Sequence, residues 1–132
     1  MQWSQKEPKY GDIIRVKMKF YYHYGLFEDE DHIIQFGFPD NTGIEPDKIA
    51  VVSTNIQAFL AGGMLETAQL SFQEKRKRRS PKASVDYAHQ KLGMTGYNIL
   101  HNNCEHFVNE CVFGEHHSSF IETARNSIRE KL

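Results

Sequence analysis

The first part of the chain shows patterns typical of β-strands. Residues 11–18 (GDIIRVKM) alternate apolar and charged side chains, as a half-buried strand does. Segments 21–27 (YYHYGLF) and 32–38 (HIIQFGF) are rich in aromatic and β-branched residues, and the acidic stretch 28–31 separates them. These segments predict a hairpin that follows an initial strand.

Shorter elements are predicted in the middle of the chain. Residues 49–53 (IAVVS) have the composition of a short strand, and 64–72 (MLETAQLSF) form a further candidate. Between them, a brief helix is expected around Ile56–Leu60, ending at Gly62–Gly63.

The pattern becomes helical from Ser80 onward. Ser80 is a favourable N-cap, and Pro81 suits the first position of a helix. Apolar residues then repeat on one face until Gly93 ends the helix. They are Val85, Ala88 and Leu92.

Two more helices are predicted near the C-terminal end. Asn103 is the expected N-cap of the first, which carries one apolar stripe and ends at Gly114. The stripe consists of Cys104, Phe107, Val108, Cys111 and Val112. The second spans about 119–131, with Ser119 and Glu122 as a capping box. Its expected buried face is Ile121, Ala124, Ile128 and Leu132.

Strands followed by helices predict one α+β domain over residues 1–132, with its core at about 10–114. The formal net charge of −1 and 25% charged residues give no support for nucleic acid as a partner. No apolar run reaches the roughly 18 residues of a membrane span, and the N-terminus lacks an apolar signal core. A soluble, cytoplasmic protein is therefore expected.

The two cysteines are expected to be free thiols. Cys104 and Cys111 are seven residues apart on one predicted helix, which separates their Cα atoms by roughly 10 Å, too far for a disulfide. The chain has no CxxC or HxxxH pair, so no metal site is expected. No cofactor is expected either.

Cys104 is the candidate nucleophile. In the first turn of a helix, unpaired N–H groups and the helix dipole favour an anion, which lowers the pKa of a thiol. The same N–H groups can stabilise an oxyanion. From periodicity alone, the alternative is that Cys104 is simply the first buried residue of the apolar stripe.

Among the seven histidines, His23 is the candidate base. Its aromatic strand neighbours can hold an imidazole in one rotamer. His106 points roughly 200° away from Cys104 on the same helix and is expected to be structural or exposed. His101 precedes the helix, but nothing fixes its position. If the hairpin turn is centred on Asp29, Gln35 lies directly across from His23 and its carbonyl can accept the imidazole N–H.

The segment 103–110 (NCEHFVNE), followed by Gly114, resembles the signature of the lecithin:retinol acyltransferase (LRAT)-like family. This family includes phospholipase/acyltransferases and belongs to the NlpC/P60 thiol-hydrolase superfamily. The resemblance extends to RSPKASVDYAHQKLG, YNILHN, GDIIRV, HYGLF and IIQFG. It covers about residues 10–114.

The resemblance implies a permuted papain-like fold, in which the base precedes the nucleophile along the chain. Cys104 matches the family nucleophile, His23 matches the general base, and Tyr21 matches a tyrosine that supports the oxyanion beside the Cys104 N–H. The third residue of the family is usually a histidine, and Gln35 stands in its place. Glutamine can orient an imidazole but cannot carry a charge.

The function expected from the resemblance is that of a thiol-dependent acyl hydrolase or acyltransferase. It would act through an acyl-Cys104 thioester on lipid esters or acyl-amides. Two alternatives remain, namely an NlpC/P60-type amidase or peptidase and a non-catalytic interaction module that keeps the fold. The basic run Lys75, Arg76, Lys77, Arg78 and Arg79 is either a membrane-surface contact or a solvated loop.

Overall fold

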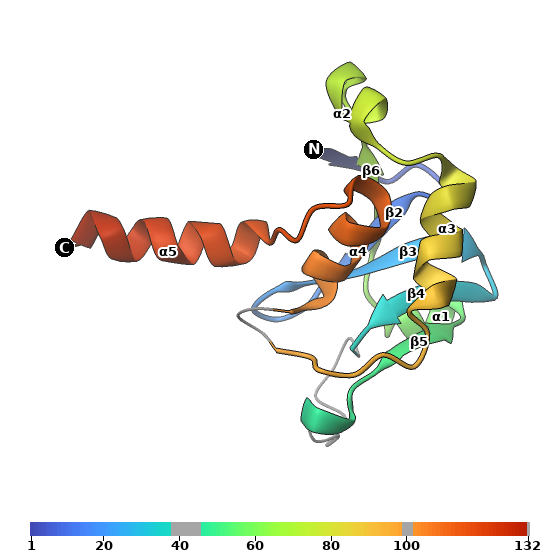
Figure 1. The fold of residues 1–132 in the computed structure, drawn as a ribbon, viewed down its shortest axis with the longest axis horizontal. Coiled ribbons are helices and arrows are strands. Elements are labelled where there is room, and N and C mark those ends of the chain that lie inside the picture. Colours follow the sequence, from blue (N-terminus) through green and yellow to red (C-terminus); the bar gives the residue numbers. More distant parts are fainter. Residues whose placement is uncertain (38–45, 99–101, 132) are drawn as a thin grey trace.

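Six antiparallel strands form one sheet in the order β1-β6-β2-β3-β4-β5 (Figure 1). The computed structural model describes residues 1–37, 46–98 and 102–131. The strands are β1 (Gln2–Ser4), β2 (Ile13–Lys17), β3 (Tyr22–Asp29), β4 (His32–Phe36), β5 (Val51–Thr54) and β6 (Leu65–Gln69). The helices are α1 (Ile56–Leu60), α2 (Phe72–Lys77), α3 (Pro81–Gln90), α4 (Cys104–Phe113) and α5 (Ser119–Lys131), with a 3-10 turn at Pro46–Lys48. The α+β prediction is confirmed.

Alternating side chains of the strands build two separate cores. On one face, α3 and α4 pack against β3 and bury Tyr24 and Leu26 (Figure 1). On the other face, Phe59 of α1 packs with Phe27 and Ile33. The central strand β3 is therefore covered on both sides, which fixes the direction of each of its side chains.

The predicted helix-terminal residues mostly have the expected roles. The Ser80 side chain caps α3, which has Pro81 in its first turn, and the Asn103 side chain caps α4. The chain leaves α4 at Gly114, whose φ of 70° suits a residue without Cβ. All five residues of the predicted stripe on α4 are buried.

Other expectations about the helices are wrong. Leu92 lies beyond the end of α3 and is 44% exposed. Ile128 is 60% exposed, because α5 projects away from the sheet (Figure 1). Ser118 precedes α5 and offers its hydroxyl to the Ile121 N–H at 3.5 Å, whereas Ser119 is the first helical residue. Phe38 and the side chains of Ala124 and Leu132 lie outside the described residues.

The basic run at 75–79 divides into two parts. Lys75, Arg76 and Lys77 are exposed on α2, a short helix that the sequence pattern did not predict. The Arg78 guanidinium donates to the Gly11 carbonyl at 2.9 Å. The Arg79 guanidinium donates to the carbonyls of Glu110 and Cys111 near the end of α4. The interpretation as a solvated loop is therefore wrong for this segment.

Replacing Arg79 by Met should destabilise the fold. The change removes charged donors from two carbonyls in the last turn of α4, and a hydrogen bond to a charged group contributes about 2 kcal/mol. Arg76→Met, on the exposed face of α2, is the matched control and should stay within about 0.5 kcal/mol of the parent. Urea unfolding followed by circular dichroism measures both, and equal effects would contradict the structural role of Arg79.

Candidate active site

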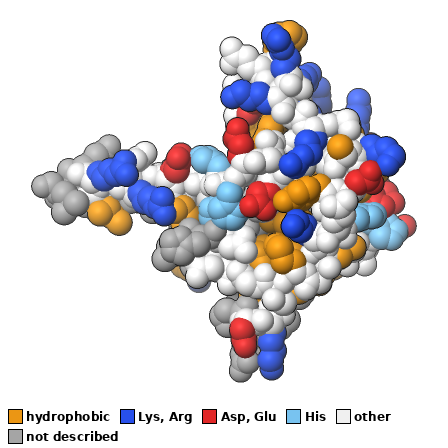
Figure 2. Space-filling view, viewed as in Figure 1, with side chains coloured by type: hydrophobic (Ala, Val, Ile, Leu, Met, Phe, Trp, Pro, Cys, Tyr) orange, Lys and Arg blue, Asp and Glu red, His pale blue; other side chains and the backbone are white. Residues whose placement is uncertain are grey.

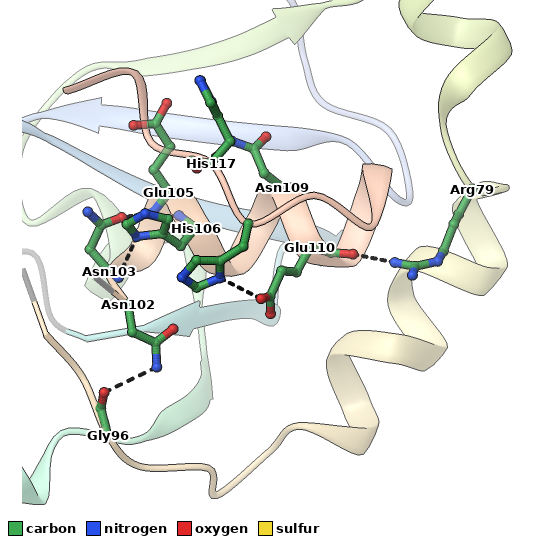
Figure 3. Close-up of polar contacts among 10 residues, drawn as sticks. Arg79, Gly96, Asn102, Asn103, Glu105, His106, Asn109, Glu110 and His117 are labelled. Atoms are coloured by element: carbon green, nitrogen blue, oxygen red, sulfur yellow. Dashed lines mark hydrogen bonds and ion pairs between the residues drawn. The ribbon is translucent and has the colours of Figure 1, made fainter. Parts of the chain in front are cut away.

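Reciprocal hydrogen bonds fix the first turn of α4. The Asn103 side chain accepts hydrogen bonds from the N–H groups of Glu105 and His106, each at 3.0 Å. In return, the Asn103 N–H donates to Nδ1 of His106 at 3.0 Å (Figure 3). His106 is 5% exposed and therefore has a structural role, which confirms the first of the two alternatives predicted for it. Cys104 is left as the first residue of the helix.

The Cys104 thiol lies against the backbone of β3. Its side chain is 4% exposed, and Sγ donates to the Tyr22 carbonyl at 3.9 Å. The Tyr24 N–H also hydrogen bonds to the sulfur. These two backbone groups flank His23 in the chain, so the thiol contacts the segment of β3 that carries the candidate base.

Burial raises the pKa of the Cys104 thiol to about 11. The N–H groups of Tyr24, Glu105 and Cys104 act in the opposite direction, while the nearby Glu105 carboxylate raises the pKa further. The prediction of a lowered thiol pKa is therefore wrong for this conformation. The N–H groups at the helix start do reach the sulfur, but the cost of burying a thiolate exceeds their effect.

His23 and Gln35 form a buried pair. Nε2 of His23 lies 2.6 Å from Oε1 of Gln35, and the two residues are 1% and 2% exposed. Because an amide oxygen only accepts, the imidazole carries its proton on Nε2 and leaves Nδ1 as the basic nitrogen. The contact between the predicted base and the predicted orienting residue is present.

The register of the hairpin differs from the predicted one by two residues. Leu26 pairs with Ile34, so the position across from Gln35 is Gly25 and not His23. The turn lies between the paired residues Asp29 and His32 instead of around Asp29, which moves the register by three residues, and the bulge between Phe27 and Asp29 brings it back by one. Since a shift of two keeps side chains on the same face, His23 still reaches Gln35 along the diagonal.

The imidazole of His23 and the thiol of Cys104 belong to different cores. The His23 ring packs on Phe59 at 5.1 Å between centroids, next to the second core, whereas Cys104 belongs to the first. Burial lowers the pKa of His23 to about 4, although the bond to Gln35 raises it. Within the described part of the chain, no hydrogen bond joins the two side chains. His101 lies outside the described residues.

A cavity of about 700 Å³ opens beside Cys104. Its lining includes an aromatic group, to which Tyr21, 38% exposed, belongs, and a basic group. The aromatic group is Phe20, Tyr21, Tyr22, Tyr24 and Tyr97, and the basic group is Arg15, Lys17 and Lys19. The cavity combines aromatic rings with polar and charged side chains, which suits a small molecule that has an apolar part and a polar part.

The sequence analysis did not predict a role for two charged residues that line the cavity. Arg15 lies between the rings of Trp3 and Tyr22, at 4.0 and 3.8 Å from their centroids, and pairs with Glu66 at 2.9 Å. Glu105 is buried and accepts hydrogen bonds from the hydroxyls of Ser118 and Ser119. Their pattern in sequence is that of ordinary strand and helix charges, so only the tertiary contacts reveal them.

One group of possible metal ligands occurs among the described residues. Glu28, Asp29 and His32 place their ligand atoms within 4.8 Å of one another at the β3–β4 turn. His32 and Asp29 are exposed and hydrogen bond to each other at 2.8 Å. None of the three lines the cavity beside Cys104.

The structure thus combines an antiparallel sheet covered by helices with a cysteine that begins one of them beside a cavity. The model of the family described as "Lecithin retinol acyltransferase" matches residues 6–117. The chain therefore belongs to the lecithin retinol acyltransferase family.

Curated relatives agree at modest identity. The chain is 27% identical over 146 residues to lecithin retinol acyltransferase of Rattus norvegicus, an alignment that covers 92% of this chain and 63% of that protein. It is 24% identical over 134 residues to phospholipase A and acyltransferase 4 of Homo sapiens, covering 95% of this chain and 82% of that protein. The chain thus spans less than two thirds of the length of the rat relative.

No helix in residues 1–37, 46–98 or 102–131 combines the length and apolarity needed to cross a bilayer.

The buried, neutral His23 predicts a loss of stability in acid. Its folded pKa of about 4 lies below the unfolded value of about 6.5, so the unfolded state binds more protons between these values and stability falls as the pH falls through this window. His23→Gln should remove up to about 3 kcal/mol of that loss, at about 1.4 kcal/mol per pKa unit. Urea unfolding at pH 7 and pH 4.5 measures it.

His89→Gln, which removes a half-exposed histidine paired with Glu28, is the matched control and should keep the acid-dependent loss attributed to His23. An equal flattening of the profile in both variants would show that burial of His23 is not its cause.

Proposed function

We propose that this protein is a thiol-dependent acyl hydrolase or acyltransferase in which Cys104 is the nucleophile. The observation that carries the proposal is the position of Cys104, in the first turn of α4 and facing the cavity of about 700 Å³. Cavity walls made largely of aromatic rings suit an acyl chain. The names of the relatives favour lipid substrates, and an ester or acyl-amide carbonyl is the proposed point of attack.

In the proposed reaction, Nδ1 of His23 takes the thiol proton while Gln35 holds the Nε2–H tautomer. The sulfur of Cys104 then bonds to the acyl carbon, and the oxyanion is stabilised by the Cys104 N–H and by the Tyr21 hydroxyl. The bond to the leaving alcohol or amine breaks as that group receives the proton. Water, or an acceptor alcohol or amine, then releases the acyl group from the thioester.

Direct proton transfer requires the imidazole and the thiol to approach each other. The thiol contacts the backbone on both sides of His23, but the imidazole lies on the opposite face of β3, so their approach requires a change in the β3 backbone as well as in the two side chains. Catalytic hydrogen bonds are often long or misaligned without substrate and tighten when it binds. The proposed fold detail, a permuted papain-like arrangement, likewise rests on the order of His23 before Cys104.

A non-catalytic acyl-binding module is the second candidate. The raised pKa of Cys104 and the position of His23 in the other core favour it, since they describe a neutral thiol beside a neutral imidazole. Such a module would use the cavity to hold an acyl chain without cleaving it. An NlpC/P60-type amidase or peptidase differs from the lipid enzyme only in substrate, and a panel of phospholipid esters and acyl-amides separates them.

The reactivity of Cys104 tests its role as nucleophile. In a Cys111→Ser background, which leaves one thiol, iodoacetamide labelling at pH 6 should be rapid when a short-chain ether lipid, which has no acyl group to transfer, is present. His23→Ala should slow it by about 100-fold, the typical contribution of a general base. Labelling that follows a pKa near 11 in every condition, unchanged by the substitution, would favour the binding module.

An acyl-enzyme should be detectable by mass spectrometry after incubation with an activated acyl ester. The expected adduct is a thioester on Cys104 that hydroxylamine removes. Cys104→Ser should abolish it, whereas Cys111→Ser, which changes a buried thiol outside the cavity lining, should keep it. An adduct that persists in Cys104→Ser would overturn the assignment.

A further inference from the structure

We infer that residues 17–21, at the end of β2 and in the loop before β3, dock this protein on a bilayer that contains anionic phospholipid. This segment is called the β2–β3 loop below. The inference deepens the proposed function, on which it rests, by identifying the surface that brings the cavity to its lipid substrate.

The apolar part of the β2–β3 loop is unusually exposed. Phe20 is 82% exposed, the highest value among the exposed large hydrophobic side chains in the described ranges, and Tyr21 beside it is 38% exposed. Burying a Phe side chain is favourable, so a ring left in water offers an apolar contact to a partner. Aromatic rings of this kind gather at the boundary between lipid and water.

Two cations flank this apolar tip. Lys17 and Lys19 are both exposed, and Nζ of Lys19 lies 5.5 Å from the centre of the Phe20 ring. In the described ranges, no salt bridge joins either lysine to a carboxylate, whereas Arg15 on the same strand is paired with Glu66. An exposed aromatic between two unpaired lysines matches a surface of anionic headgroups, since each cation near such a surface contributes about 1 kcal/mol.

The β2–β3 loop also lines the cavity beside Cys104. Lys17, Phe20 and Tyr21 belong to its wall, so a lipid surface in contact with the loop faces the opening that leads to the thiol. Docking by this loop therefore gives an acyl chain a direct path from the bilayer to the candidate nucleophile.

The exposed basic residues of α2 form the competing surface. Phe72 is 75% exposed there, and Lys75, Arg76 and Lys77 are exposed on the same helix. Figure 2 shows basic and hydrophobic side chains together at the top of the view, where α2 lies in Figure 1. None of these residues lines the cavity beside Cys104. Arg78, the residue after α2, contacts Gly11, which precedes β2. Gly11 and Lys17 are six residues apart, or roughly 20 Å at about 3.3 Å per strand residue. The two surfaces can thus be tested separately.

Flotation with phosphatidylcholine vesicles, with and without phosphatidylserine, tests the inference on the full chain. The protein should bind the anionic vesicles more tightly, and added salt should weaken this binding. Lys17→Ser with Lys19→Ser should reduce partitioning into anionic vesicles about 30-fold, at about 1 kcal/mol per cation. Phe20→Ser should reduce binding to both kinds of vesicle about tenfold, because it removes an apolar contact.

The matched control is Lys75→Ser with Lys77→Ser, which removes the same charge from α2. It should leave partitioning unchanged, and the emission of Trp3, the single tryptophan, checks that each variant is folded. An equal loss in the control, no loss in the loop variants, or equal binding to neutral and anionic vesicles would overturn the inference.

Vesicle binding by Cys104→Ser, which lacks the proposed nucleophile, separates the docking surface from the proposed chemistry. Cys104→Ser should bind anionic vesicles as the parent does. Loop-dependent binding together with an unreactive thiol would keep the docking surface and remove the enzyme. A reactive thiol together with binding that does not depend on the loop would keep the proposed enzyme and remove the docking surface.

Discussion

The placement of the first turn of α4 against β3 is the constraint on which the candidate site depends. Asn103 and His106 hold that turn by reciprocal hydrogen bonds, and Arg79 binds carbonyls at the other end of the helix. An Asn cap alone is worth about 1 kcal/mol, so its larger effect is geometric. It sets Cys104 as the first helical residue, with its sulfur on the backbone of β3 and its side chain at the cavity.

The same placement sets two effects against each other. A helix start favours a thiolate, and a buried position disfavours it. Here burial dominates, since the pKa of Cys104 is raised to about 11 even though three backbone N–H groups act on the sulfur. The resting thiol is accordingly uncharged. Its chemistry depends on what substrate brings into the cavity, and a lipid surface at the β2–β3 loop is one way to bring it.

Local signals in the sequence predicted the elements better than their contacts. The stripe on α4 and the hairpin that carries His23 follow from periodicity, because caps and apolar repeats act within a few residues. The predicted hairpin register differs by two residues, since neither the position of the turn between Asp29 and His32 nor the bulge at Phe27–Asp29 is evident from composition. The role of Arg79 depends on carbonyls about 30 residues later in the chain, and that of Glu105 depends on two serines that follow α4. The raised pKa of Cys104 depends on total burial, which a helix pattern does not reveal.

Gln35 gives the candidate base a neutral partner. Its amide oxygen fixes the tautomer of His23, but an amide adds no negative charge to stabilise an imidazolium. Burial near Phe59 acts in the same direction and lowers the pKa of His23 to about 4. Both effects disfavour a standing thiolate–imidazolium pair. Within the proposed mechanism, they favour transfer of the thiol proton in the same step as attack on the carbonyl, when the developing oxyanion and the incoming substrate change the local field.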